Sequence, residues 1–534
     1  MSTTVATAPV NKWRRLSERI RQPEWRRYGY AYLSGKLLGM VLLLVAIVLV
    51  ASIIGGKAHA ADPLLKGNDL VNPLNTVWTL VAAFLVFAMQ TGFTMLEAGF
   101  CRARETVNVL IECVVDTCLC GVLFYAIGFA LMFGAGTPFF GTQYFFLQGA
   151  PATYGSTGVA FLAFWVFQYA FADTCSTITD GSMCGRTSFV GDLIYSAVVT
   201  GLIYPIVGHW AWGPDGFLAL MGSAGHFLPG LGTSFHDFAG STVVHTIGGM
   251  IAFAGAIALG PRIGRRFKRD GGGPMLPHDL TMATVGALIL WFGWYGFNPG
   301  STLNAMDFEG IGRVAANTTI AACTGCLAAL FFAFPKTKKW DLSYSINGML
   351  AGLVAITCPC YWVSPLGAFI IGAVGGVVVV LGCDLLEWLR VDDPCGATAV
   401  HGFAGIWGTL SLGLFACGFG VTGPFGADLS SPVKGLFYGG GWQVFFAQCI
   451  GSAIVTAVTL GVALLMFYGI KALGHLRVSR DGELEGLDLY EHGVPAYPEY
   501  ALHRSATPQG THAFNSAAFS DATPEMQTNA VKPR

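Results

Sequence analysis

The chain has 534 residues, of which 53% are hydrophobic and only 11% charged, with a net charge of −1. Soluble domains carry roughly a quarter charged residues, so this composition excludes an ordinary soluble globular protein. Apolar runs of about 18 residues or more recur, and each can cross a bilayer as a helix. The 71 glycines suit close helix packing in lipid, where small residues let backbones approach. The composition predicts an all-α polytopic membrane protein in contact with membrane lipid.

The first sixty residues have the parts of a secretory signal. Residues 1–36 are basic, residues 37–54 are apolar, and Ala58-His59-Ala60 provides a small-x-small exit. The apolar part is longer than the roughly 7–15 residues usual for a signal, so an uncleaved N-terminal anchor stays open. We favour cleavage of a signal peptide covering residues 1–60. Both alternatives leave residue 61 outside the cell.

The rest of the chain is predicted to cross the membrane repeatedly. The predicted spans are the following eleven segments: 77–99, 107–134, 158–184, 189–212, 237–260, 280–300, 313–334, 345–358, 364–388, 399–420 and 440–470. Every second loop between them is basic, and the alternate loops are nearly free of Lys and Arg, apart from Lys434. Positive charge marks the cytoplasmic side. We therefore expect a multi-pass protein of the inner or plasma membrane, with its mature amino terminus outside and its carboxyl terminus in the cytoplasm.

One phrase occurs twice in the chain. Residues 237–245 read DFAGSTVVH and residues 393–401 read DPCGATAVH, so both open on an aspartate and close on a histidine. If spans one to five and six to ten are two copies, the odd number of spans inverts the second copy. Eleven helices then form two five-helix inverted repeats plus one further helix, with a site near the midplane. Each histidine would lie about 12 Å from its aspartate along a helix, inside a hydrocarbon core about 30 Å thick.

The two histidines that close the phrase, His245 and His401, are candidate site residues. An ionisable residue inside a membrane helix indicates function by default. A lone histidine more often has its hydrogen bonds satisfied by a neighbouring helix. Two histidines at matching positions of a repeat favour a functional site instead. Several small residues follow the histidines and are expected to leave space beside each ring: Gly248, Gly249, Gly402, Ala404 and Gly405.

The other chemically active residue types show no catalytic pattern. Most of the fourteen cysteines lie in apolar runs, as small buried hydrophobes do. Cys358 and Cys360 are too close in sequence for good disulfide geometry. No zinc-type spacing, cofactor loop or nucleophile–base–oxyanion arrangement occurs. We therefore expect no enzyme, no cofactor and no resident metal.

Five separated strings carry a family resemblance. They are MLEAGF, DFAGSTVVH, WFGWYGFNPGS, VDDPCGATAVHG and EGLDLYEHG, in that order. Together they resemble the ammonium transporter (Amt/Mep/Rh) family, bacterial Amt type, over roughly residues 75–500. The resemblance implies a membrane domain over residues 75–472 and a cytoplasmic regulatory tail over residues 473–500. The Ser/Thr/Ala/Pro-rich residues 501–534 are expected to be disordered.

The resemblance also assigns site residues. In that family two histidines hydrogen-bond ring to ring along a narrow apolar pore, which by motif are His245 and His401. Ammonium recruitment and gating fall to four residues: Phe171, Trp212, Phe297 and Ser301. Aromatic faces attract a cation by roughly 0.5–2 kcal/mol each, and the serine offers a hydroxyl acceptor. Asp237 and Asp393 are expected to support the site structurally.

The substrate that the resemblance implies explains such a pore. Ammonium is almost fully protonated at pH 7, as a lysine head group is, and driving the bare ion through an apolar channel is costly. Neutral ammonia crosses cheaply, whereas potassium has no proton to release. We therefore expect a transporter that recruits ammonium, deprotonates it and conducts ammonia past the histidines. Three points stay open: electrogenic or passive transport, an Rh-type ammonia or carbon dioxide channel, and an ammonium sensor with little transport.

The expected partners also follow from the resemblance. Similar members form homotrimers with one pore per subunit, and some are blocked by a PII-type signalling protein at the cytoplasmic face. Ammonium or ammonia is the expected small-molecule partner. No nucleic acid partner is expected.

Several acidic residues depart from the family pattern or have no assigned role. Asp173 and Asp180 stand where small neutral residues are usual, and Gly185 precedes Arg186 where the family often has glutamate. Asp173 follows the gate residue Phe171 by two positions and could bind a cation or water, or face a neighbouring helix. We assign Glu97, Glu112 and Asp116 to packing or interhelical hydrogen bonding.

Overall fold

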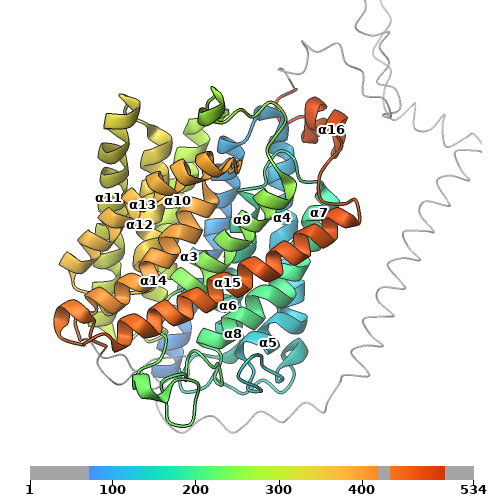
Figure 1. Cartoon of the computed structure of the whole chain (residues 1–534). Coiled ribbons are helices and arrows are strands. Elements are labelled where there is room, and N and C mark those ends of the chain that lie inside the picture. The colour runs from blue at the N-terminus through green and yellow to red at the C-terminus, as the bar shows by residue number, and fades with distance from the viewer. Residues whose placement is uncertain (1–70, 419–432, 499–534) are drawn as a thin grey trace, which may run out of the picture. The chain divides into compact units, whose positions relative to one another are not determined.

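A computed structural model describes residues 71–418 and 433–498. The predicted signal or anchor over residues 1–60 and the tail from residue 501 lie outside the described residues. The described part is a bundle of helices with isolated β-bridges and no sheet (Figure 1).

The first half of the bundle runs from α3 to α9. Its elements are α3 (Val71–Phe100), α4 (Thr106–Leu123), the π-helix η2 (Phe124–Gly128), α5 (Phe129–Phe133), α6 (Phe161–Asp180), α7 (Phe189–Val198), the π-helix η4 (Val199–Ile203), α8 (Tyr204–Trp212), the π-helix η6 (Ser241–Thr246) and α9 (Ile247–Leu259). The chain passes through η2 and η4 without a break, so the α-helices on either side of each form one continuous rod.

The second half runs from α10 to the carboxyl-terminal segment. Its elements are α10 (Leu280–Phe297), the short η8 (Pro299–Thr302), α11 (Phe308–Thr337), α12 (Leu342–Thr357), α13 (Pro365–Leu389), the π-helix η9 (Thr398–Phe403), α14 (Ala404–Phe415), α15 (Gln443–Ala472), α16 (Arg480–Glu485) and α17 (Leu487–Tyr490). The long helix α15 lies across the bundle in Figure 1.

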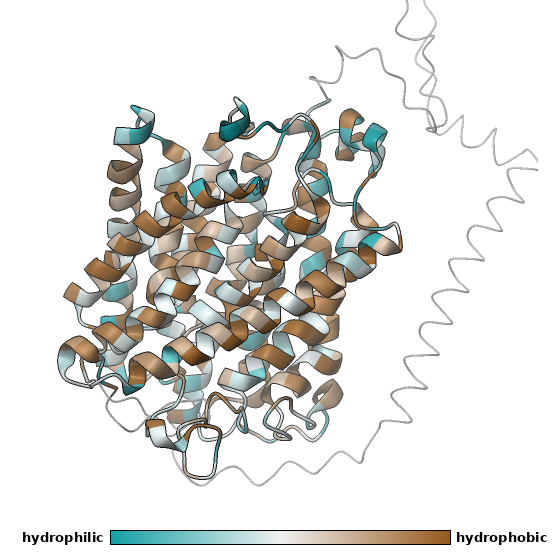
Figure 2. Cartoon of the chain, in the orientation of Figure 1, coloured by the Kyte–Doolittle hydropathy of each residue, from teal (hydrophilic) through white to brown (hydrophobic). Residues whose placement is uncertain are grey.

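The described residues contain eight helical segments long and apolar enough to cross a bilayer. Their middles are hydrophobic and the hydrophilic residues gather toward the ends and loops (Figure 2). Large apolar side chains such as Phe84, Leu366 and Leu465 stay exposed on outer helices. Lipid tails can cover such a surface, which water would not favour.

Polar side chains set where many helices begin. Asp279, Asp307, Asp341 and Ser364 accept hydrogen bonds from backbone N–H groups in the first turns of α10, α11, α12 and α13. Such caps satisfy donors that have no partner inside the helix. Most helix bounds fall within a few residues of the predicted spans. The predicted 237–260 segment becomes helical later, at Ser241, because the preceding residues form a capping turn.

The end of the bundle that contains loops 101–105, 181–188, 260–279 and 390–397 is termed the basic end. Arg262 and Asp392 form a bidentate ion pair there, with Nε–Oδ2 and Nη2–Oδ1 distances of 2.8 and 2.9 Å. Burial would raise the pKa of Asp392, but the Arg262 guanidinium holds that pKa well below its usual range. This pair therefore stays ionised at neutral pH and fixes two loops that are distant in sequence.

Glycines let α3 and α10 pack backbone against backbone. A Cβ at Gly286 would lie 2.5 Å from Leu96 N and 2.6 Å from Gly92 O. A Cβ at Gly99 would lie 2.5 Å from Asp279 O. Neighbouring backbone cannot move aside as a flexible side chain can, so these contacts require glycine.

This contact predicts unequal effects of two Gly→Ala changes. Gly286→Ala should lower the thermal midpoint of the detergent-solubilised protein, because the added methyl meets backbone. Gly461→Ala on α15 is the matched control, since a Cβ there meets nothing within 4 Å. It should be neutral or slightly stabilising, because alanine favours a helix over glycine by up to about 1 kcal/mol. Equal midpoints for both variants, measured by scanning fluorimetry, would contradict the close packing.

Candidate functional site

The two copies of the repeated phrase form the same turn. The Asp237 carboxylate accepts backbone N–H bonds of 2.9 Å from Gly240, Thr242 and Val243. The Asp393 carboxylate accepts equivalent bonds of 2.9–3.1 Å from these residues: Gly396, Ala397 and Thr398. Each aspartate therefore satisfies buried donors at the start of a helix, which would otherwise be costly in a membrane.

The repeated phrase also has a glycine at the same position in both copies, Gly240 and Gly396, because the turn requires it. Gly240 and Gly396 have φ angles of +114° and +77°. Side chains are strained in this region, so glycine is the residue that the turn requires. After each turn the chain enters a π-helix, η6 in one copy and η9 in the other, and each histidine lies in that π-helix.

The structure brings His245 and His401 together. Their Nδ1 atoms are 3.2 Å apart, within hydrogen-bond distance, and their rings stack with centroids 5.2 Å apart and planes inclined by 25°. The side chains are 0% and 4% exposed. One Nδ1 must donate and the other accept, so the pair holds at least one ring proton between the helices.

The helices that carry the histidines cross in direct backbone contact. A Cβ at Gly249 would lie 2.2 Å from Gly402 N, and one at Gly405 would lie 2.5 Å from Ser241 O. The hydroxyl groups of Thr242 and Thr409 also hydrogen-bond across the crossing. Gly249, Gly402 and Gly405 therefore make room for the neighbouring helix, and this brings the rings into contact. The expectation that the small residues leave space beside the rings stays a prediction.

Apolar rings surround the histidine pair. His245 stacks on Trp294 and Phe297 with centroid distances of 5.1 and 5.3 Å, and Phe93 lies 6.4 Å from the ring of His401. Among the described residues, His245 Nε2 has no hydrogen-bond partner. Sequence reasoning missed Phe93 and Trp294. The place of Trp294 within the WFGWYGFNPGS string was the available signal.

The four predicted recruitment and gate residues gather on the His245 side of the pair. Phe171 stacks on Phe297 with centroids 4.0 Å apart, and Trp212 meets Phe171 edge to face at 6.1 Å. Trp212 Nε1 donates to Asp237 O at 2.7 Å, and Ser301 Oγ donates to Phe297 O at 2.7 Å. All four side chains are at most 2% exposed. The rings of Phe171, Trp212 and Phe297, which are termed the aromatic group, therefore pack together with no access to solvent. The Ser301 hydroxyl uses its proton in this bond and keeps its oxygen lone pairs as acceptors.

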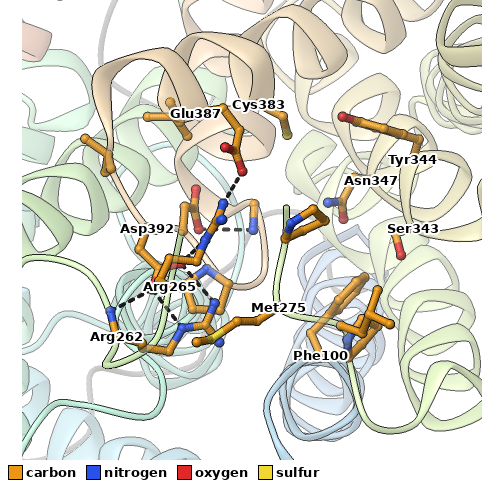
Figure 3. Close-up of a pocket in the computed structure, with 18 of the residues that line it drawn as sticks. Phe100, Arg262, Arg265, Met275, Ser343, Tyr344, Asn347, Cys383, Glu387 and Asp392 are labelled. Carbon is orange, nitrogen blue, oxygen red and sulfur yellow. Dashed lines mark hydrogen bonds and ion pairs between the residues drawn. The ribbon is translucent and has the colours of Figure 1, made fainter. Parts of the chain in front are cut away.

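Two cavities follow on the His401 side. The first has free space of about 10 Å³, and its lining includes His401, Glu97 and Asn347. The second has about 210 Å³ and lies at the basic end, with Asn347, Tyr344 and Arg265 in its lining (Figure 3). Asn347 belongs to both linings, so the two cavities share this residue.

The unusual acids of α6 are fully buried. Asp173 lies near Gln90 and Thr117. Asp180 accepts a 2.5 Å hydrogen bond from Tyr195 OH. One carboxylate oxygen each from Asp116, Asp180 and Asp192 lies within 4.8 Å of the others, and this trio is termed the inner acid cluster.

Where the family often has a glutamate before Arg186, this chain has Gly185, and another loop brings an acid to that position. A Cβ at Gly185 would lie 2.5 Å from a carboxylate oxygen of Glu105, which approaches from another loop. Arg186 donates to the backbone oxygens of Gly260 and Asp392 at 3.2 and 2.7 Å. An acid from a different part of the chain therefore lies against Gly185, where it pairs with Arg102.

The carboxyl-terminal segment docks on the basic end. Glu483 accepts from Ile263 N at 2.6 Å and pairs with Arg477 at 2.8 Å. The Asp488 carboxylate accepts from Asn108 N at 3.0 Å, and burial raises its pKa. Both acids are almost completely buried. The tail thus connects α4 with the loop after α9.

A bundle of apolar helices with a buried polar pair at a helix crossing is the architecture of a membrane transport protein. The match to the Ammonium Transporter Family over residues 77–497 shows that the chain belongs to that family. Its members are transport proteins and not enzymes. The chain is therefore a multi-pass membrane protein of the ammonium transporter family.

Individual relatives agree with this assignment. The chain is 41% identical to ammonium transporter Amt2 of Archaeoglobus fulgidus over 473 residues, which cover 88% of this chain and 97% of that protein. It is 40% identical to ammonium transporter 1 member 1 of Oryza sativa subsp. japonica, over 82% of this chain and 89% of the relative.

Solved structures are similar as well. The chain matches a structure named Sensor Amt Protein with a TM-score of 0.70 and 33% identity, over 80% of this chain and all of the other. It matches Mep2 of Candida albicans with a TM-score of 0.69 and 26% identity, over 82% and 96% of the two chains.

The aspartate turn yields a stability prediction. Asp237→Ala removes the acceptor of three backbone donors, and each buried donor left without a partner costs about 1–3 kcal/mol. We expect a lower thermal midpoint and faster hydrogen exchange over residues 240–246. Asp237→Asn keeps one oxygen acceptor and should be less damaging. If the two variants exchange at the wild-type rate, the carboxylate does not hold the turn.

Proposed function

We propose that this chain moves ammonium across the membrane by recruiting the ion at the aromatic group, removing a proton, and passing ammonia by His245 and His401. The observation that carries the proposal is the 3.2 Å contact between the two buried imidazoles. An imidazole pair can accept a proton or hydrogen-bond a neutral amine, because each ring has one donor and one acceptor nitrogen. The unpartnered His245 Nε2 adds a free group on this route.

The order of the groups supports this route. Phe297 contacts both Phe171 and His245, so the aromatic group and the histidine pair adjoin each other. On the other side of the pair, the small cavity and the larger pocket reach the basic end. A closed aromatic group keeps water from the apolar section, and this favours passage of a neutral molecule over a hydrated ion.

We also propose eleven crossings, arranged as two five-helix inverted repeats and one further helix, α15. The helical segments α6, α12 and η9–α14, which are either shorter or less apolar, supply the crossings beyond the eight long apolar segments. The matching turns before η6 and η9 support an internal repeat. The arginines of the basic end favour its placement in the cytoplasm, with the mature amino terminus outside.

Assembly and regulation complete the proposal. Residues 473–500 act as a cytoplasmic regulatory tail, because the tail contacts α4 and the loop after α9 at once. The subunits form a homotrimer in which each chain carries its own pore. A PII-type protein is the candidate regulator at the basic end.

An ammonium sensor with little transport is the second candidate function, supported by the similarity to the structure named Sensor Amt Protein. Restored growth of an uptake-deficient cell on low ammonium would favour transport over sensing. A passive Rh-type ammonia or carbon dioxide channel is the third. Electrical current on adding ammonium to proteoliposomes would separate an electrogenic transporter from that channel.

The histidine pair predicts a loss of selective uptake. His245→Ala and His401→Ala should each reduce ammonium uptake into proteoliposomes roughly tenfold or more, because proton exchange at a positioned group contributes at least that much. The ratio of ammonium to potassium uptake should fall too. Size-exclusion profiles and thermal midpoints check the fold. Wild-type selectivity in both variants would refute the proposed role of the pair.

The recruitment residues predict a change in affinity. Trp212→Leu and Ser301→Ala should raise the half-saturating ammonium concentration about 2- to 30-fold, which corresponds to roughly 0.5–2 kcal/mol of lost cation attraction. The maximal rate should change less, because the histidine pair is intact. Initial rates over a range of ammonium concentrations measure both constants. An unchanged half-saturating concentration would remove the residues from recruitment.

A further inference from the structure

Three carboxylates from three helices converge in the inner acid cluster. Asp116 lies on α4, Asp180 at the end of α6 and Asp192 on α7, and they are 0%, 3% and 0% exposed. One carboxylate oxygen of each lies within 4.8 Å of the other two. Among the ion pairs between described residues, none includes these acids. The cluster therefore buries three acids without pairing them with a lysine or an arginine.

Each of the three carboxylates also has one oxygen that accepts no hydrogen bond. Among the described residues, Asp116 Oδ1, Asp180 Oδ2 and Asp192 Oδ2 are buried and have no partner. Buried polar atoms are nearly always partnered. Three unpartnered oxygens on three converging side chains therefore indicate a bound group that carries positive charge.

The hydrogen bonds inside the cluster supply too few protons for its oxygens. Tyr195 OH contacts Asp180 Oδ1 at 2.5 Å and also contacts Asp192 Oδ1. A phenol has one proton and donates it to one acceptor. The other contact brings two acceptor oxygens together, which is unfavourable if both acids are ionised and nothing lies between them. Asp116 Oδ2 accepts from Ser196 Oγ at 2.9 Å, so this hydroxyl proton is already used.

The charged groups around the cluster are acids as well. Glu97 and Glu112 are electrostatic neighbours of Asp180, and Asp173 lies near the same group. Glu112 is also close to Glu491 of the carboxyl-terminal segment. These acids lead from the tail at the basic end to the cluster and offer a cation an attractive path. Burying so many carboxylates is costly unless positive charge neutralises them.

We propose that the inner acid cluster binds a hard divalent cation, with Ca²⁺ as the ion that fits best. Its donors are all oxygens, and carboxylate oxygen selects Ca²⁺ and Mg²⁺ over metals that prefer sulfur or nitrogen. Ca²⁺ takes about 6–8 oxygens at about 2.3–2.6 Å, so opposite ligands lie about 5 Å apart, similar to the 4.8 Å limit that contains the three carboxylate oxygens. Mg²⁺ usually keeps several waters, and a fully buried set of side chains leaves less room for them.

The site goes beyond the proposed function and does not depend on it. The sequence predicted no resident metal, because the three acids come from separate segments and show no ligand spacing. A cation at the cluster connects α4, α6 and α7. Phe171 lies on α6, and α7 continues through η4 and α8 to Trp212. The cation therefore stabilises the two rods that carry these rings of the aromatic group.

The test measures Ca²⁺ binding to the full chain in a neutral detergent, after a chelator has removed bound metal. We expect one tightly bound Ca²⁺ per chain by equilibrium dialysis. Asp192→Asn should weaken this affinity roughly tenfold or more, because it removes a charged ligand. Asp481→Asn, the same change at an exposed position of α16, is the matched control and should bind as the wild type does. Ca²⁺ should raise the thermal midpoint of the wild type and of Asp481→Asn, but not that of Asp192→Asn.

Terbium luminescence provides a second readout, with Tb³⁺ in place of Ca²⁺. Tyr195 should sensitise the emission of Tb³⁺, and added Ca²⁺ should displace the ion. If Asp192→Asn fails to fold, Tyr195→Phe decides, because it keeps all three carboxylates. This variant should still bind Ca²⁺ but give weaker emission, and unchanged emission would place the ion elsewhere. A wild type that binds no Ca²⁺ at millimolar concentration would show that protons alone neutralise the cluster, and this would overturn the proposal. Equal affinity in Asp192→Asn and the wild type would overturn it too.

Discussion

The contact between His245 and His401 depends on two aspartates that hold the backbone from which each histidine starts. Inside a membrane a free backbone donor has no water to bind, so each turn is stable only with an internal acceptor. Asp237 and Asp393 supply that acceptor in the two copies. After each turn the chain enters a π-helix that carries a histidine, and the helix crossing brings the two rings into contact.

The same constraint shapes the packing around the pair. Without a hydrophobic driving force between helices in lipid, close contact depends on small residues and buried hydrogen bonds. Gly249 and Gly402 provide a close backbone approach at the crossing, and Gly286 provides one between α3 and α10. Since backbone contacts leave little freedom for sliding, the rings are held within hydrogen-bond distance. The positions of Phe297 and Trp294 against His245 then follow from the placement of α10.

At the basic end, ion pairs rather than small residues hold the segments together. The Arg262–Asp392 ion pair joins the loop after α9 to the loop before η9, which are the two loops attached to the histidine helices. Glu483 of the tail binds the backbone of Ile263 in the first of these loops. The tail therefore contacts the loop that follows the helix carrying His245.

Much of this protein could be read from local sequence. The length of the apolar runs predicts the long helices, and capping residues such as Asp279 and Ser364 mark where helices begin. Both effects act within a short stretch of chain. The repeated phrase identified both histidines and both aspartates, and the family resemblance identified Phe171, Trp212, Phe297 and Ser301. Their roles in transport remain predictions.

The tertiary structure alone decided which groups meet. It brought the glycines after the histidines into a backbone crossing, placed Glu105 against Gly185, and put Glu97 and Asn347 in one cavity with His401. Local sequence predicted packing or interhelical hydrogen bonding for Glu97, because an acid on an apolar helix looks the same whether it faces a helix or a cavity. The local periodicity of a helix fixes which residues share a face, but the partner of that face depends on contacts between segments hundreds of residues apart.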